Sequence, residues 1–226
     1  MPPLTDIQQL LDQVDAINRR YRATQQDPRY QFNIFTILRH ANDEVSLHSR
    51  FLAEILDPQG QHLQGTTFLA LFLDRLGIGD VDVEHTVVQR EYWNIDLLIT
   101  DATHAMIIEN KIDAADQPRQ LERYYATIEQ EGYTKIDVVY LTLYGHQPSR
   151  QSTGHLDRST IQCISYADDI HAWIDECISK TTHIPAVSEV LFQYRRVIEG
   201  LTGQSLSKGH IMEIKELLLT EKNIEL

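Results

Sequence analysis

The stretch Asn94-Ile95-Asp96-Leu97-Leu98-Ile99 is followed, after a short polar segment, by Ala105-Met106-Ile107-Ile108-Glu109-Asn110-Lys111-Ile112. Both are short apolar runs rich in branched side chains, and the segment between them is polar enough for a hairpin connection. The pattern therefore predicts two adjacent antiparallel strands. Three charged residues, Asp96, Glu109 and Lys111, interrupt these apolar runs, and charges in such a position need a partner.

The alternation of side chains along a strand decides where these charges point. Glu109 and Lys111 lie on one face and Asn110 on the other, and Asp96 on the neighbouring strand can join the first two. The flanking isoleucines indicate a central strand, where a charge is costly unless it is paired or bound to a metal. Two converging carboxylates suit Mg²⁺, which accepts one or two carboxylates together with substrate phosphate oxygens.

This residue set is typical of phosphodiester hydrolysis. Asp96 and Glu109 would bind the metal, and the main-chain carbonyl of Asn110 could add a third protein ligand. Lys111 is the candidate to position the attacking water and to stabilise charge that develops on the phosphate. The alternative is a buried salt bridge in which Lys111 is a plain counter-ion, because motifs this short often occur by chance.

Asp96 followed by Glu109-Asn110-Lys111 resembles the signature of the PD-(D/E)xK nuclease superfamily, in which an acidic residue on one strand precedes D/E-x-K on the next. Ile95 replaces the usual proline, a departure that many members share. Gln120-Leu121-Glu122-Arg123-Tyr124 resembles the Q-x-x-x-Y helix motif of RecB-like members. The likeness to an uncharacterised bacterial or phage-type branch runs from about residue 35 to 201, through Glu44, residues 48–58, His62, Ser165-Tyr166, Trp173 and Gln193-Tyr194.

The resemblance implies an α/β fold of the α+β type: a restriction-endonuclease-like core with a mixed central β-sheet flanked by helices, plus extra N- and C-terminal helices. It implies an Mg²⁺- or Mn²⁺-dependent (endo)deoxyribonuclease that uses a metal-activated water, with nucleic acid, DNA above all, as partner and a role in defence, restriction or repair. Gln120 and Tyr124, four residues apart on one helix face, would bind substrate by positioning the water or the phosphate backbone. Without the resemblance, a surface glutamine and a packed tyrosine would be expected.

Further candidates lie near the N-terminal end of the likeness. Glu44 could supply another carboxylate for a second metal, or it could simply complement the dipole at a helix start. His48 and His62 could contact phosphate as substrate-binding residues, or they could cap and brace helices. Cys163 and Cys177 are expected to be buried free thiols, because no Cys or His spacing suggests zinc.

The composition fits an ordinary globular protein, with 226 residues of which 42% are hydrophobic. No apolar run approaches the ~20 residues that span a membrane, and no signal-peptide pattern is present, so the expected location is the cytoplasm, away from membranes. The pattern of apolar residues predicts an amphipathic helix and linker over 1–30, a nuclease-like domain over 31–205 and a C-terminal helix and tail over 206–226.

The predicted elements of this domain are helices at 44–56 and 66–76, a strand at 81–92, the two motif strands, a helix at 117–130 with Pro118 in its first turn, strands at 136–143 and 161–165, and helices around Trp173 and at 187–201. The N-terminal helix is expected from Leu4 to about Arg22. Packing on its own chain and dimerisation both remain open for its apolar face.

The net charge of −13 opposes binding of nucleic acid, because Lys and Arg supply most of the affinity for phosphates. Metal ions and the small basic clusters at 19–22 and 195–196 could offset it locally, and a homodimer or partner subunit could deliver the substrate. A second hypothesis is therefore a catalytically inactive nuclease-fold module that acts as a protein- or DNA-binding scaffold.

Overall fold

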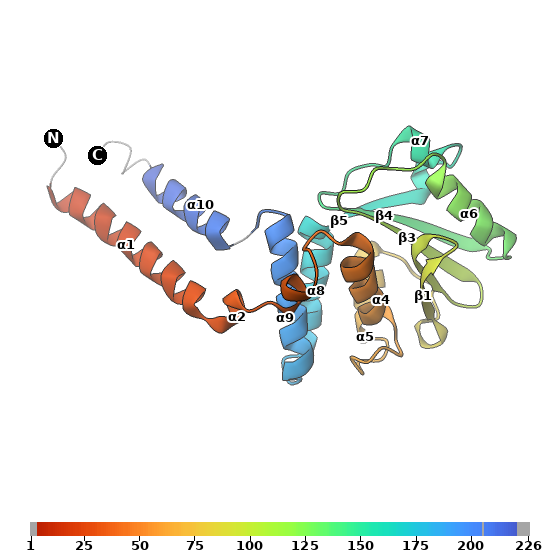
Figure 1. The fold of residues 1–226 in the computed structure, drawn as a ribbon, viewed down its shortest axis with the longest axis horizontal. Coiled ribbons are helices and arrows are strands. Elements are labelled where there is room, and N and C mark those ends of the chain that lie inside the picture. The colour runs from red at the N-terminus through yellow and green to blue at the C-terminus, as the bar shows by residue number, and fades with distance from the viewer. Residues whose placement is uncertain (1–3, 205, 221–226) are drawn as a thin grey trace. The chain divides into compact units, whose positions relative to one another are not determined.

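The computed structural model describes residues 4–204 and 206–220 (Figure 1). The chain divides into two compact units, one of Phe35–Thr202 and one of Met1–Ile34 with Gly203–Leu226. The larger unit differs by only a few residues at each end from the predicted domain 31–205. The two terminal segments, predicted as separate parts, belong to one unit. Within the described part of the chain, no helix combines the length and apolar character needed to cross a membrane.

A five-stranded mixed sheet forms the centre of the larger unit. The strand order is β1-β2-β3-β4-β5, with β1, β2 and β3 antiparallel and β3, β4 and β5 parallel. β3 is the middle strand, and all eight of its residues are buried, which confirms the predicted central position. The bounds of the strands are Val87–Tyr92 (β1), Ile95–Thr100 (β2), His104–Lys111 (β3), Lys135–Thr142 (β4) and Ile161–Ser165 (β5).

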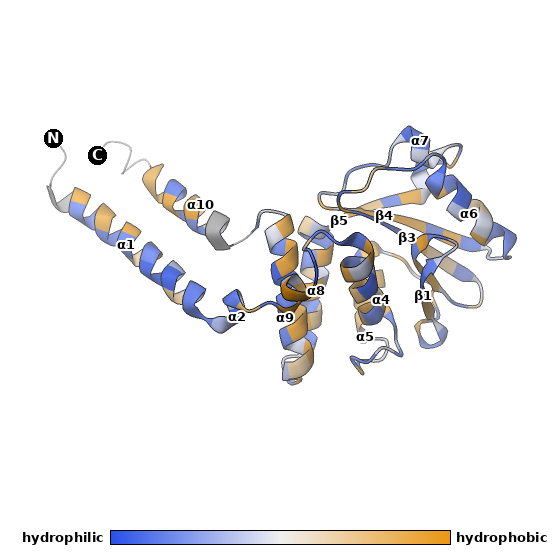
Figure 2. Ribbon diagram, in the orientation of Figure 1, coloured by the Kyte–Doolittle hydropathy of each residue, from blue (hydrophilic) through white to orange (hydrophobic). Residues whose placement is uncertain are grey.

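Helices cover both faces of this sheet. One face carries the larger apolar core, which α4, α5, α8 and α9 complete, and α6 covers the other face. Met106 and Ile108 point into the larger core, whereas Ala105 and Ile107 point toward α6, so β3 is apolar on both sides, as strands covered on both faces are. Figure 2 shows hydrophobic residues along these strands and the helices. The helices are Arg50–Leu56 (α4), Thr67–Leu76 (α5), Gln120–Gln130 (α6), His171–Lys180 (α8) and Pro185–Leu201 (α9).

This arrangement confirms the predicted α/β fold with a mixed sheet flanked by helices. Short elements complete the larger unit: α3 (Ile34–Leu38) at its boundary, α7 (Arg150–Thr153), the π-helical turns Glu44–Ser49 and Tyr166–Ile170, and the 3-10 turns Val83–His85 and Arg158–Thr160. The predicted polar loop from 145 to 159 thus contains α7.

Two elements of the larger unit begin later than predicted, for local reasons. The strand predicted from Val81 begins only at Val87, because residues Val83–His85 form a 3-10 turn. The Thr86 hydroxyl closes this turn by donating a 2.8 Å hydrogen bond to the main-chain carbonyl of Asp82. The helix predicted from 117 begins at Gln120, because Arg119 has a left-handed φ of 54° that no α-helix contains. Pro118 therefore lies in the preceding loop.

The smaller unit contains α1 (Leu4–Gln26), α2 (Pro28–Gln31) and α10 (Leu206–Leu218). α1 is longer than predicted and packs against α10: the rings of Tyr21 and His210 stack with centroids 4.0 Å apart, and His210 Nε2 lies 2.9 Å from Asn18 Oδ1. Arg20 forms an ion pair with Glu213. The N-terminal helix therefore finds a partner in its own chain. Residues 221–226 of the predicted tail lie outside the described residues.

Candidate active site

The hairpin of β2 and β3 brings the motif residues together. Leu97 pairs with Ile108 and Thr100 with Ala105, which confirms the predicted antiparallel pair. Asp101 closes the turn, because its Oδ1 accepts hydrogen bonds of 2.8 Å from the backbone N–H groups of Thr103 and His104. Continued past the last pair, this register places Asp96 across from Glu109.

The Asp96 side chain takes the place of a main-chain carbonyl where the backbone pairing of β2 and β3 ends. Its Oδ2 accepts a 2.8 Å hydrogen bond from the Asn110 N–H, just beyond the pair of Leu97 and Ile108. Burial raises the pKa of Asp96, although the Asn110 N–H and the charge of Lys111 act in the opposite direction. The carboxylate is thus held in place by the backbone of the strand that carries Glu109.

Glu109 is the most deeply buried carboxylate of the site, with 1% of its surface exposed. Its Oε1 lies 2.6 Å from Lys111 Nζ and accepts a 2.7 Å hydrogen bond from Gln120 Nε2. Its Oε2 is buried and accepts no hydrogen bond from any described residue. Burial, followed by the charge of Asp96, raises the pKa of Glu109 to about 8. Without a bound cation, Glu109 therefore keeps its proton near pH 7, because the protein alone does not offset a second negative charge at this position.

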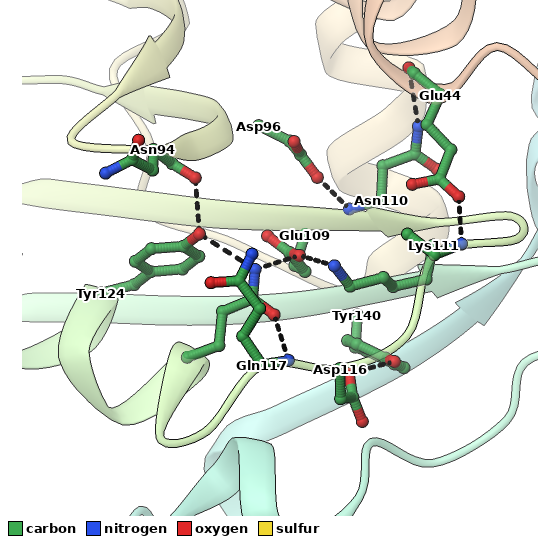
Figure 3. Close-up of polar contacts among 12 residues, drawn as sticks. Glu44, Asn94, Asp96, Glu109, Asn110, Lys111, Asp116, Gln117, Tyr124 and Tyr140 are labelled. Carbon is green, nitrogen blue, oxygen red and sulfur yellow. Dashed lines mark hydrogen bonds and ion pairs between the residues drawn. The ribbon is translucent and has the colours of Figure 1, made fainter.

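Lys111 remains a cation despite its position. Burial acts to lower the pKa of the ammonium group, but the carboxylates of Glu109, Asp96 and Glu44 outweigh this effect and raise it. The side chain lies on the same face as Glu109, two residues earlier, as strand alternation requires. The predicted cluster of Asp96, Glu109 and Lys111 is therefore present, and it contains one fixed positive charge (Figure 3).

Gln120 and Tyr124 reach this cluster from the start of α6. Gln120 Nε2 donates to Glu109 Oε1 and also lies 3.0 Å from the Tyr124 hydroxyl. That hydroxyl donates a 2.5 Å hydrogen bond to the carbonyl of Asn94. The two side chains are four residues apart and share the helix face that covers the sheet, which is the placement that the sequence predicted for them. Their roles toward a substrate stay predictions.

Glu44 lies beside the site, and one of its carboxylate oxygens binds the backbone of the loop after β3. Its Oε1 accepts backbone N–H hydrogen bonds of 2.9, 2.6 and 2.7 Å from Ile112, Asp113 and Ala114. The carboxylate therefore holds the loop that directly follows Lys111. Its charge is near enough to raise the pKa of Asp96. A role of Glu44 as ligand of a second metal stays a prediction.

The two histidines are structural, and the prediction that His48 contacts substrate is wrong. His48 has no exposed surface, its Nδ1 lies 2.9 Å from the Tyr194 hydroxyl, and its Nε2 lies 2.7 Å from the carbonyl oxygen of Ala41. Burial lowers its pKa to about 4, so the ring is neutral near pH 7. His62 braces its own loop, because Nε2 lies 2.9 Å from the Asp57 carbonyl oxygen and Nδ1 accepts from the Gln64 N–H.

Sequence reasoning missed the polar contacts that hold Asn110 from behind the sheet. Its side-chain Nδ2 donates to Ser49 Oγ at 3.1 Å and to the Glu44 carbonyl at 3.3 Å, and its Oδ1 accepts from the Tyr166 hydroxyl at 3.0 Å. These contacts anchor the peptide between Glu109 and Lys111. Strand alternation did place Asn110 on the opposite face, but its partners come from distant segments.

A second missed pair lies next to Glu109 in the sheet. Tyr140 on β4 is in register with Glu109, and its hydroxyl donates a 2.8 Å hydrogen bond to Asp116 Oδ1. The other oxygen of Asp116 accepts from the Ser149 N–H at 2.7 Å. Both oxygens of Asp116 are thus engaged, and the residue ties the loop before α6 to the loop before α7. Its place became evident only from the parallel pairing of β3 with β4.

The donor set fits an oxygen-bound divalent cation. No group of three His, Cys, Asp or Glu side chains arranged to hold a metal occurs among residues 4–204 and 206–220. Mg²⁺, however, commonly takes only one or two carboxylates and completes its shell with water and phosphate oxygens. Asp96 and Glu109 supply the two carboxylates, and the buried Glu109 Oε2 that lacks a hydrogen-bond donor is an acceptor that a cation would satisfy.

The sequence was compared with known families, curated proteins and solved structures. The family model for the PD-(D/E)XK nuclease superfamily matches residues 32–196. Curated proteins and solved structures gave no significant match. The matched region contains the whole sheet and every residue of the cluster around Glu109. The chain therefore belongs to the PD-(D/E)XK nuclease superfamily.

Proposed function

We propose that the protein is an Mg²⁺- or Mn²⁺-dependent nuclease that hydrolyses phosphodiester bonds in DNA. The observation that carries this proposal is the pair of Asp96 and Glu109, in which Glu109 Oε2 is buried without a donor and the pKa of Glu109 is raised to about 8. A salt bridge with Lys111 needs only one acidic side chain, whereas two converge here and the pKa of the more buried one is raised.

The residues of the cluster divide the chemistry among them. Asp96, Glu109 and the Asn110 carbonyl would hold the metal, which when bound supplies positive charge that activates water and neutralises the phosphate. Lys111, held 2.6 Å from Glu109 Oε1, positions the attacking water and stabilises charge that develops on the phosphate oxygens. Gln120 fixes the orientation of the Glu109 carboxylate through its 2.7 Å hydrogen bond.

The test is cleavage of supercoiled plasmid and of single-stranded DNA with Mg²⁺ or Mn²⁺. Lys111→Ala and Asp96→Ala should abolish cleavage while the protein stays folded by circular dichroism, and Asp96→Ala should also weaken metal binding. Lys180→Ala is the matched control, because Lys180 is an exposed lysine in the last turn of α8. Cleavage that survives in both site variants would refute the assignment of the site.

The alternative proposal is a catalytically inactive scaffold that binds protein or DNA. The net charge of −13 favours it, because this charge opposes extensive contact with phosphates. Absence of cleavage by the wild-type protein with either metal would support the scaffold. The nuclease proposal allows for a homodimer, since cutting both strands of a duplex needs two sites, and its cellular role would be defence, restriction or repair.

A further inference from the structure

The turn between β1 and β2 contains a residue type that rarely adopts the backbone angles found there. Tyr92 pairs with Ile95, so Trp93 and Asn94 form a two-residue loop, and both have positive φ values, 50° and 66°. Loops of this kind strongly prefer Asn-Gly, because glycine and asparagine adopt positive φ at low cost. A bulky residue such as tryptophan is a genuine outlier there. Glu91, just before the turn, also has a positive φ of 55°.

The ring of Trp93 is exposed and yet held in position. The residue exposes 64% of its surface. Its Nε1 donates a 3.2 Å hydrogen bond to Glu131 Oε1, and the hydroxyl of Tyr92 donates to the same oxygen at 2.8 Å. Glu131 directly follows α6, so one carboxylate at the end of this helix orients two neighbouring aromatic rings. An indole fixed in this way would lose little conformational freedom on binding a flat ligand.

A chain of hydrogen bonds joins this turn to the active site. The carbonyl of Asn94 accepts from Tyr124, whose hydroxyl lies 3.0 Å from Gln120 Nε2, and that nitrogen donates to Glu109 at 2.7 Å (Figure 3). Asp96 is only three residues after Trp93. The chain of hydrogen bonds ends at the main-chain carbonyl of Asn94, whereas the indole is held by Glu131 at the other end of α6 from Gln120. Because about 16 Å of helix separates Glu131 from Gln120, the ring lies a few nucleotides' length from the cluster that would hold the scissile phosphate. Strained backbone of this kind is concentrated at functional sites.

We propose that Trp93 is a stacking platform for an unpaired nucleobase a few nucleotides from the scissile phosphate, so that the substrate is single-stranded DNA. This inference rests on the proposed function. A base fits this position better than a phosphate does, because the carboxylate of Glu131 beside the ring repels a phosphate, whereas stacking on an aromatic face requires no charge. Stacking also works with any base sequence. The affinity that it adds offsets part of the loss caused by repulsion between the net charge of −13 and the phosphates.

The two tryptophans of the chain provide a built-in assay. Trp173 has no exposed surface and donates its Nε1 to the carbonyl of Phe68, whereas Trp93 is exposed, so quenching of indole fluorescence by an oligonucleotide would report Trp93. The probe is oligothymidine, added in a chelator to the Lys111→Ala protein so that no cutting occurs. We expect saturable quenching, and weaker quenching when a duplex of the same length replaces the single strand.

Substitutions separate stacking from a structural role. Trp93→Asn should lower the affinity for fluorescein-labelled oligothymidine about 5-fold or more, the effect of losing one stacked base. Its melting temperature should not fall, because asparagine suits a positive φ. Trp93→Phe, which keeps an aromatic face, should restore most of the affinity. Reduced affinity in Trp93→Asn that Trp93→Phe does not restore would overturn the stacking proposal.

The outcomes also separate this inference from the nuclease proposal. Oligonucleotide cleavage by the wild-type protein with unchanged affinity in Trp93→Asn would overturn the stacking proposal and leave the nuclease standing. Saturable quenching by oligothymidine without any cleavage would support the base platform and refute the nuclease. A wild-type protein that binds no oligothymidine, or that binds it without quenching, would overturn the stacking proposal directly.

Discussion

The burial of His48 predicts a specific loss of stability in acid. The ring has no exposed surface, and burial lowers its pKa from the ordinary 6.5 to about 4. Between pH 6.5 and pH 4 the unfolded chain therefore binds a proton that the folded protein does not, so the free energy of unfolding falls as the pH falls through this window. At 1.36 kcal/mol per pKa unit, the full loss is about 3 kcal/mol, complete below pH 4.

The assay is urea unfolding in a chelator at several pH values between 7.5 and 4, for wild type and for His48→Gln. Glutamine cannot titrate, so the difference between the two stability curves isolates the histidine. This subtraction also removes Glu109, whose raised pKa gives stability the opposite dependence, a loss as the pH rises toward 8. Parallel curves, or an NMR titration of the His48 ring near pH 6.5, would refute the buried placement and revive a contact with substrate.

Three shorter predictions follow from single contacts. Mn²⁺ affinity should rise with pH up to about 8, and calorimetry near pH 7 should detect a released proton, because Glu109 must ionise to bind the metal; binding without proton release would contradict this. Asn110→Leu should cost about 1–3 kcal/mol in urea unfolding, since the buried Tyr166 hydroxyl loses its acceptor, and wild-type stability would argue against that contact. Gly60→Ala should lower stability by about 1–3 kcal/mol, because its Cβ would lie 2.5 Å from the Glu54 carbonyl oxygen; an unchanged melting temperature would show that the turn can relax.

Local pattern was sufficient wherever the deciding information lay within a few residues. The alternation in β3 placed Glu109 and Lys111 on one face and Asn110 on the other, and the polar turn at Asp101 indicated the hairpin. The four-residue spacing of Gln120 and Tyr124 placed both on the helix face that meets the sheet. These features need only the geometry of a strand or a helix, which is the same in every protein.

Long-range packing explains most of what the sequence did not predict. His48 is enclosed by Tyr194, which is 146 residues away, so no local pattern could identify its burial. Asn110 likewise depends on Ser49 and Tyr166. The sequence led to no prediction for Trp93, because its exposure and the positive φ of its turn depend on how β1 and β2 are paired.

The pairing of α1 with α10 sets the order in which the two units can form during synthesis. A ribosome synthesises Asn18 long before His210, which lies 192 residues later in the sequence and is its contact in the folded protein. Until then α1 lacks this partner, and even in the folded chain Leu11 on α1 exposes 54% of its surface. The residues of the larger unit leave the ribosome first, so nuclease folding can precede closure of the helix pair.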